Sequence, residues 1–383
     1  MRLLILSNAS FLDCSIRTGL QQLAFEWAQL GATVDYVSCP LHPLDFVSRS
    51  RRARWRAAWF GRGTFAFEVS GVGALKEHFI RVPFSRHKRW WRSATQLDLY
   101  RSWIPSRLGD QNYDVCLLDT SYAALFADRV KARHFIYRIN DHPEGFQHHM
   151  SDHVISWFSA KVRSGLFKEA WPVSDALSEW VVAENAVLSS EVIPNGVALD
   201  AFSSVTSQLE LNRAVYLGAF NEWFDWDLLV RSARLLPEGW SIDLYGPLGD
   251  RRALKCLPVN VHWRGAVEYD AVPELLGCYS VGLLPFKPHH NFLDHFDPLK
   301  AYQYWAAGLG VAATDYGRMQ VALSPWANYG NTPEEFAQSI VQAQENRPSG
   351  DPALSECLKQ RSWSAIGRHT YQKMRRLYEG CDS

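Results

Sequence analysis

The chain has 383 residues and a formal net charge of zero, with 47% hydrophobic and 21% charged residues. This balance describes a globular protein and excludes a disordered one, and the length favours two domains over a single core. The apolar runs are strand-sized, so the sequence predicts no membrane-spanning helix. We read the N-terminal MRLLILSNAS as a first strand and not as a signal peptide, and the seven scattered cysteines predict reduced thiols in the cytoplasm.

The first half of the chain alternates strand-like and helix-like segments. Gly31 ends the first predicted helix, and Ser174–Asp175 has N-cap chemistry at the start of another. Such alternation predicts a βαβ arrangement, and therefore a mostly parallel sheet covered on both faces. Strands are expected at 2–7, 33–39, 113–119, 134–140 and 170–174, and helices at 19–31 and 175–185.

A turn at Pro194-Asn195-Gly196 and a polar stretch separate this half from a second alternating series. Strands are expected there at 213–220, 240–247, 261–267, 280–286 and 310–315. The predicted class is α/β, with two tandem Rossmann-like doubly wound domains and a cleft between them. The predicted limits are 1–198 for the N-terminal domain, 199–212 for a linker, 213–362 for the C-terminal domain and 363–383 for a C-terminal helix.

The formal charge is unevenly distributed. Residues 49–107 contain twelve arginines and two lysines against three acidic residues, a net charge of +11, so the rest of the chain carries −11. Aromatic residues alternate with these basic ones, among them Trp55, Trp59, Trp90 and Trp91. Arginine and lysine attract anionic headgroups, and tryptophan prefers the membrane interface. The pattern therefore favours an anionic membrane surface as partner, over nucleic acid and over a solvated basic face.

The stretch HFDPLKAYQYWAAGLGVAATD, residues 295–315, predicts a loop, a helix and a buried strand. Lys300 lies in the first turn of that helix, where free backbone N–H groups and the helix dipole favour an anion such as phosphate. Gln303 lies one turn later and faces the same way. The alternative is a solvated lysine on an amphipathic helix.

Three segments together resemble GT-B glycosyltransferases: VIPNGVALDAF, YLGAFNEWFDWDLL and DPLKAYQYWAAGLGVAAT. Their order and spacing match the domain junction, the first loop of the donor domain and the nucleotide-sugar motif of that family, and the resemblance covers most of the chain. It extends to bacterial exopolysaccharide enzymes of the xanthan glucuronosyltransferase and teichuronic-acid types. His295 and Gln303 stand where the widest retaining subgroup has two glutamates, so neither position supplies an anion here.

The resemblance implies a hexosyl- or glucuronosyltransferase that binds its nucleotide-diphosphate sugar in the C-terminal domain. Lys300 would stabilise the charge that grows on the leaving diphosphate, without a metal ion or other cofactor. Gly218 and Ala219 would bring backbone N–H groups to the phosphates, and Phe286 would either stack on uracil or pack in the core. The predicted donor-binding residues are Gly218, Ala219, Phe220, Phe286, His295, Lys300 and Gln303.

Asp141 follows a predicted strand in the pattern Tyr-Arg-x-x-Asp, whose aspartate is the general base in the enzymes that the chain resembles. The alternative is an aspartate that caps the next element. The acceptor-binding residues implied by the loop after the first strand and by this pattern are Asp13, Arg17, Tyr137 and Arg138. Other carboxylates that could act as the base are Asp13, Asp119 and Glu144.

His149 and His153 have a metal-ligand spacing, but histidines that contact a polyanionic donor or a sugar are the favoured interpretation, and no metal is predicted. The expected acceptor is a saccharide, lipid-linked at the cytoplasmic face of the membrane, in cell-surface or exopolysaccharide synthesis. A sugar-nucleotide 2-epimerase and a non-catalytic membrane- or polysaccharide-binding protein remain as alternatives. An oxidoreductase is disfavoured, because no GxGxxG motif follows the first strand.

Overall fold

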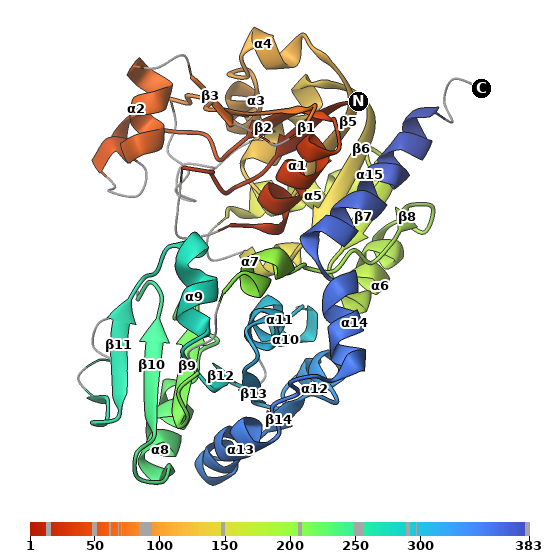
Figure 1. The fold of residues 1–383 in the computed structure, drawn as a ribbon. Coiled ribbons are helices and arrows are strands. Elements are labelled where there is room, and N and C mark those ends of the chain that lie inside the picture. Colours follow the sequence, from red (N-terminus) through yellow and green to blue (C-terminus); the bar gives the residue numbers. More distant parts are fainter. Residues whose placement is uncertain are drawn as a thin grey trace. The chain divides into compact units, whose positions relative to one another are not determined.

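The protein folds into two compact units, seen in a computed structural model (Figure 1). The first unit comprises Met1–Pro194 and Ser364–Ser383, and the second comprises Asn195–Trp363. Each unit has its own apolar core and its own sheet, mostly parallel in the first unit and all-parallel in the second, as the alternation of strands and helices predicts. The structure describes residues 1–12, 17–47, 52–60, 63–67, 69, 71–83, 94–146, 150–205, 209–248, 254, 256–288, 292–295 and 297–379.

The limits of the two units differ from the predicted domain limits. The first unit leaves off at Pro194, before the predicted limit at 198, because the segment that follows pairs with the end of the second unit. The backbone N–H of Val197 donates to the Arg361 carbonyl at 2.8 Å, and the N–H of Trp363 donates to the Val197 carbonyl at 3.1 Å. The predicted linker of 199–212 contains a short helix, α7.

The first unit is built on an eight-stranded sheet in the order β3-β4-β2-β1-β5-β6-β7-β8. Strand β3 runs antiparallel to β4, and the other pairs are parallel. The central strands are buried on both faces, which explains apolar runs such as LLIL in β1. The strands are β1 (Arg2–Leu6), β2 (Thr33–Val37), β3 (Thr64–Phe67), β4 (Ala74–His78), β5 (Asn112–Leu118), β6 (Lys131–Ile139), β7 (Glu169–Pro172) and β8 (Ser189–Ser190).

Helices cover this sheet, and the C-terminal helix α15 joins them. The indole Nε1 of Trp27 in α1 donates to Thr370 Oγ1 in α15 at 3.0 Å, and Lys373 of α15 forms ion pairs with Glu169 and Glu191. These contacts place the C-terminal segment in the first unit. The helices are α1 (Gly19–Gln29), η1 (Pro43–Val47), α2 (Arg52–Phe60), α3 (Ala94–Arg101), α4 (Ser106–Gly109), η4 (Ala123–Arg129), η5 (Pro143–Phe146), α5 (Asp152–Arg163), α6 (Asp175–Glu184) and α15 (Trp363–Glu379).

The second unit has a six-stranded, all-parallel sheet in the order β11-β10-β9-β12-β13-β14. In chain order this is the doubly wound arrangement 3-2-1-4-5-6, whose topological switch point lies between β9 and β12. Helix α11 packs on β12 and β13, while α13 packs on β13 and α8 (Figure 1). The strands are β9 (Arg213–Leu217), β10 (Ser241–Tyr245), β11 (Val261–Gly265), β12 (Val281–Leu284), β13 (Gly310–Ala313) and β14 (Ala327–Tyr329).

The helices of the second unit close both faces of its sheet. Their apolar sides join the buried strands in one core, which explains the periodic apolar residues in segments such as WDLLVRSARL. The helices are α7 (Leu199–Ser203), α8 (Trp226–Leu235), η7 (Tyr269–Ala271), α9 (Val272–Leu276), α10 (Phe292–His295), α11 (Leu299–Ala306), α12 (Met319–Leu323), α13 (Pro333–Glu345) and α14 (Pro352–Gln360).

Candidate functional site

Glycines follow or end the neighbouring strands β9, β10 and β11 at their carboxyl edge. Gly218 and Gly246 have positive φ values of 153° and 144°, and a Cβ on Gly246 would lie 1.9 Å from the Gly218 carbonyl oxygen. The Gly218 N–H donates to the Tyr245 carbonyl at 2.9 Å, which ties the two loops together. Backbone therefore approaches backbone here as only glycine allows.

Lys300 brings its ammonium group to this edge of the sheet. It lies in the first turn of α11, and a Cβ added at Gly218 would lie 2.2 Å from its Cε and 2.5 Å from its Nζ. The Nζ atom is 5.3 Å from the ring centroid of Tyr216 and 5.9 Å from that of Phe286. The lysine thus lies against the loop after β9, between two aromatic rings that attract its charge weakly.

The charge of Lys300 has no counter-ion in the part of the chain that the structure describes. Its amine forms no ion pair and no hydrogen bond with the described residues. Burial lowers the pKa of the amine to about 8, because a charged group loses favourable hydration when it is enclosed. An anion bound beside it would stabilise the protonated form, so this geometry suits an anion.

A network that sequence reasoning missed holds the start of α11 in place. Asp297 accepts from the Asn195 N–H at 2.7 Å and from Arg361 Nη1 at 2.9 Å, and the Arg361 guanidinium lies 4.0 Å from the ring centroid of Tyr302. The ion pair is mostly buried, so truncating either partner would strand a charge. The only signal in the sequence was the position of Asp297, three residues before Lys300.

The other predicted donor residues lie in different environments. Phe286 is 1% exposed and belongs to the core of the second unit, as does Phe220, which supports packing over stacking on a base for Phe286. Gln303 is 8% exposed, and its amide forms no hydrogen bond with the described residues. Ala219 follows Gly218, and its carbonyl accepts from the Tyr216 hydroxyl at 3.0 Å. His295 ends α10 and is half-buried.

In the first unit, Asp141 follows strand β6 at the carboxyl edge of the sheet. Burial raises the pKa of its carboxyl group to about 6. The carboxylate forms no hydrogen bond or ion pair with the described residues, so it does not cap a described helix there. A partly enclosed carboxyl group that ionises just below neutral pH has the properties of a general base.

The structure places Tyr137 and Arg138 of β6, two predicted acceptor contacts, inside the first unit. Both are fully buried. The Tyr137 ring stacks on Phe158 and Phe167, and Arg138 donates to the backbone carbonyls of Ile193 and Pro194. Successive strand residues point to opposite faces, so the two side chains enter opposite layers of the unit, where they serve as scaffold.

Two further carboxylates of the first unit are buried near the ends of strands. Asp119 follows β5 and accepts from the Ser7 hydroxyl, and burial raises its pKa to about 6. Glu77 in β4 accepts from the Phe11 N–H at 3.1 Å, and burial raises its pKa to about 7. Asp119 is thus held by a buried partner, unlike Asp141.

The remaining predicted residues have no contact with Lys300 or Asp141 that the structure describes. The guanidinium of Arg17 lies 5.5 Å from the ring centroid of Phe25. Asp13, His149 and the side chain of Glu144 lie outside the described residues. Among the described residues, no group of three or more His, Cys, Asp or Glu could hold a metal ion, and no described helix is long and apolar enough to span a bilayer.

No protein-family model and no curated protein sequence matches the chain. Solved structures match the chain over nearly its whole length. Sucrose-phosphate synthase from Thermosynechococcus elongatus matches with a TM-score of 0.70 and 13% identity over 99% of each chain. HepE from Anabaena in complex with UDP and glucose matches with a TM-score of 0.65 and 13% identity, over 98% of this chain and 99% of that one. The pneumococcal O-GlcNAc transferase GtfA, in complex with UDP and GlcNAc, matches with a TM-score of 0.65 and 12% identity over the same shares.

The chain has the GT-B fold. The predicted α/β class with two parallel-sheet domains is thereby confirmed, and at these identities the likeness concerns the fold alone. The switch point of the second sheet lies between β9 and β12. Gly218 directly follows β9, and Phe286 lies in the loop that follows β12. Ligands of doubly wound sheets bind outside the carboxyl ends of the strands at this point. Lys300 lies against both residues, so its ammonium group is placed at the switch point.

Proposed function

We propose that this protein is a glycosyltransferase that moves a sugar from a nucleotide-diphosphate donor to a saccharide acceptor. The observation that carries the proposal is Lys300, an ammonium group at the switch point of the second sheet without a counter-ion among the described residues. A nucleotide diphosphate would supply the missing negative charge. Two solved structures of the same fold are complexes with UDP and glucose and with UDP and GlcNAc, which makes UDP the first nucleotide to test.

The proposed reaction breaks the bond between the anomeric carbon and the diphosphate oxygen, whose electron pair stays on the diphosphate. Lys300 stabilises the charge that grows there, and the helix start of α11 adds its partial positive charge. The acceptor hydroxyl forms the new bond to the anomeric carbon and loses its proton to Asp141. With a pKa of about 6, Asp141 is ionised at neutral pH and still basic enough to accept a proton. A hexosyl or glucuronosyl donor fits this chemistry equally.

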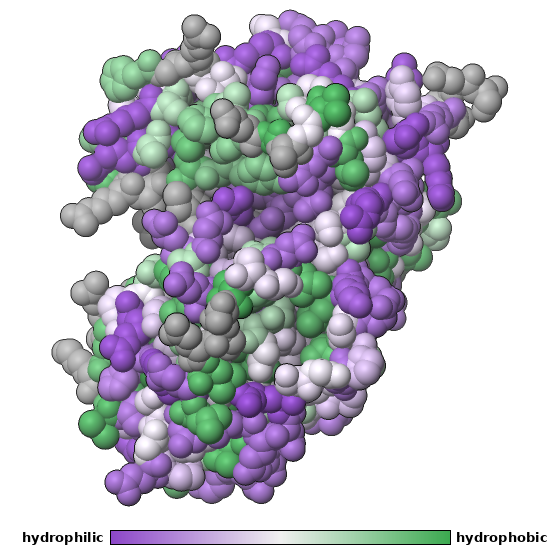
Figure 2. All heavy atoms as spheres, viewed as in Figure 1, coloured by the Kyte–Doolittle hydropathy of each residue, from purple (hydrophilic) through white to green (hydrophobic). Residues whose placement is uncertain are grey.

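We further propose a lipid-linked acceptor and attachment to an anionic membrane through the basic region 49–107, in cell-surface polysaccharide synthesis. Helix α2 supports this, because its exposed Arg52 and Arg56 line a groove together with apolar side chains of η1 and α2. Hydrophilic and hydrophobic residues lie next to one another in this region of the surface (Figure 2). Phe60 is 81% exposed, and apolar residues of η1 are exposed as well. Basic residues near an anionic surface contribute about 1 kcal/mol each. The exposed apolar residues of η1 and α2 are Leu44, Phe46, Val47 and Phe60, whereas Trp90 and Trp91 lie outside the described residues.

Calorimetry with UDP tests the donor site. The wild-type chain is expected to bind UDP, and Lys300→Ala is expected to lose most of this affinity because a charge-assisted hydrogen bond is removed. The matched control is Lys359→Ala, which removes an exposed lysine from α14 of the same unit. Equal UDP affinities for the wild type and Lys300→Ala, with both proteins folded, would reject the assignment.

A thermal-shift panel of nucleotide sugars would identify the donor, since a bound ligand raises stability by mass action.

A further inference from the structure

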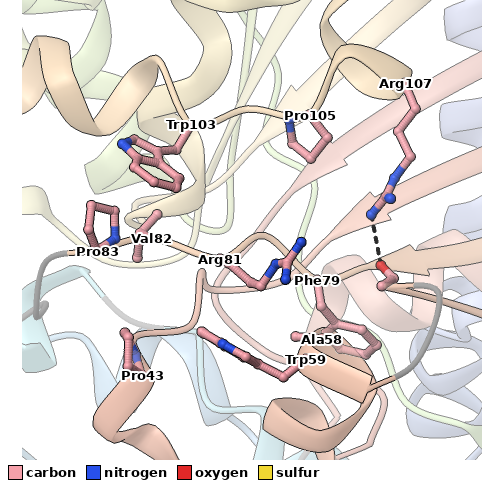
Figure 3. Close-up of a pocket in the computed structure, with 11 residues that line it drawn as sticks. Pro43, Ala58, Trp59, Phe79, Arg81, Val82, Pro83, Trp103, Pro105 and Arg107 are labelled. Carbon is pink, nitrogen blue, oxygen red and sulfur yellow. Dashed lines mark hydrogen bonds between the residues drawn. The ribbon is translucent and has the colours of Figure 1, made fainter.

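A cavity of about 830 Å³ opens in the first unit beside helix α2 (Figure 3). This volume falls within the range of about 300–1,000 Å³ that is typical of small-molecule sites. Its walls come from α2, from the ends of β4 and α3, and from α4, and they include Trp59, Phe79, Arg81, Val82, Trp103 and Arg107. None of these residues has a part in the donor site or in the proposed proton transfer.

Two arginines, Arg81 and Arg107, line the cavity. Burial, and then the positive charge of Arg81, lower the pKa of Arg107. Arg107 Nη2 donates to the Gly63 carbonyl at 3.0 Å, while the Arg81 guanidinium lies 5.9 Å from the ring centroid of Trp59 (Figure 3). Arg81 forms no ion pair with the described residues. Arg81 is therefore available to an anion, and guanidinium groups match phosphate oxygens in geometry.

The remaining walls are apolar. Apart from the indole N–H groups, the two guanidinium groups are the only polar side chains among the described lining residues. Phe79 and Val82 present buried apolar surface, and Trp103 is 47% exposed. A sugar or a nucleobase would require hydrogen-bonding partners that these walls do not offer, so the lining selects an anionic head on an apolar body.

The apolar surface continues out of the cavity along α2. The Trp59 indole stacks on Trp55, with ring centroids 5.1 Å apart and planes at 10°. Trp55 in turn lines an adjoining groove of about 490 Å³ with Phe46, Val47 and two arginines of α2. An apolar chain that leaves the cavity would therefore stay in contact with aromatic and aliphatic side chains.

We propose that this cavity binds the phosphoryl group of a prenyl phosphate or diphosphate, with the prenyl chain running along the groove beside Trp55. Arg81 and Arg107 hold the phosphoryl oxygens, and Trp59 and Trp103 pack against the first isoprene units. The assignment of this lipid as the carrier of the saccharide acceptor rests on the proposed glycosyltransferase function. Binding of the lipid itself does not depend on that function.

Calorimetry with three soluble probes separates the lipid from free phosphate. Farnesyl diphosphate is expected to bind at least about tenfold more tightly than either pyrophosphate or farnesol, because each of these offers only one half of the ligand. Equal binding of pyrophosphate would overturn the lipid assignment and point to a soluble phosphate. Equal binding of farnesol would overturn the role of the arginines.

Variants locate the probe in the cavity. Arg81→Gln is expected to weaken the binding of farnesyl diphosphate about tenfold to a hundredfold, because a charge-assisted hydrogen bond is lost. This variant removes no hydrogen bond to the described residues, so its folding is not at risk, whereas Arg107→Gln loses the bond to Gly63 and needs a circular-dichroism check. Trp103→Ala is expected to weaken the binding of farnesyl diphosphate but not that of pyrophosphate. The matched control is Arg129→Gln, an exposed arginine of the same unit outside the cavity.

The cavity assignment would be overturned if Arg81→Gln and Arg129→Gln weakened farnesyl diphosphate binding equally, or if neither variant weakened it. UDP affinity measured on the same variants separates the two proposals. Unchanged UDP binding with no cavity-dependent lipid binding rejects the lipid site alone. Cavity-dependent lipid binding without any UDP binding rejects the donor site alone and leaves the lipid site standing.

Discussion

Gly218→Ala offers a test of the donor site that leaves every charge in place. The added Cβ would lie 2.2 Å from Lys300 Cε and 2.5 Å from Nζ, so the lysine side chain has to move away from the edge of β9. A lysine is flexible enough to move without disrupting the core. The expected result is a folded protein whose ammonium group no longer meets the donor diphosphate.

The size of the effect follows from the interaction that is lost. A hydrogen bond to a charged group contributes about 1.5–3 kcal/mol, which corresponds to about a 10- to 150-fold loss of UDP affinity. Gly218 also has a φ of 153°, so alanine is strained there and should lower the free energy of unfolding by about 1–2 kcal/mol. Calorimetry with UDP and urea denaturation measure the two effects separately.

Two controls complete the test. Gly239 has a φ of 88° and nothing within 4 Å of an added Cβ, so Gly239→Ala should carry a comparable backbone cost and bind UDP normally. In the Lys300→Ala background, Gly218→Ala should cause little further loss of UDP affinity, because the two changes remove the same interaction. Wild-type UDP affinity in Gly218→Ala, or additive losses in the double variant, would refute the placement of the donor beside Lys300.

Five other outcomes are expected. Asp141→Asn should fold and bind UDP like the wild type yet transfer almost no sugar in a turnover assay, and near-normal turnover would place the base elsewhere. The pH profile of kcat/KM should rise through about 6 as Asp141 loses its proton and fall through about 8 as Lys300 loses its proton. Lys300→Arg should abolish the alkaline fall, since arginine stays protonated, and an unchanged fall would assign it to another group. Arg138→Met should lower the free energy of unfolding in urea by about 3 kcal/mol, through the loss of its bonds to buried carbonyls, and a change near zero would contradict the scaffold role. Binding to anionic vesicles in co-sedimentation should weaken at high salt and be absent with neutral vesicles; equal binding to both, or to neither, would refute membrane attachment through 49–107.

Local chain chemistry was enough to predict most of the fold. Apolar runs such as LLIL and VCLL are buried on both faces in a parallel sheet, so they identify central strands without knowledge of their partners. Strands β3 and β4 escaped prediction because their residues lie among the arginines of the basic region and are only partly apolar. The positions of Lys300 at a helix start and of Asp141 after a strand were also readable, since both depend on neighbours in the chain.

Contacts between distant segments decided the rest. The lysine lies against Gly218, more than eighty residues earlier in the chain, and its lowered pKa arises from this enclosure. Tyr137 and Arg138 matched a functional pattern but are buried, because burial depends on which layers cover β6. Arg81, after β4, and Arg107 of α4 line one cavity although they are far apart in the chain. Desolvation and charge–charge interactions depend on distances in space, and sequence order does not determine those distances until the chain has folded.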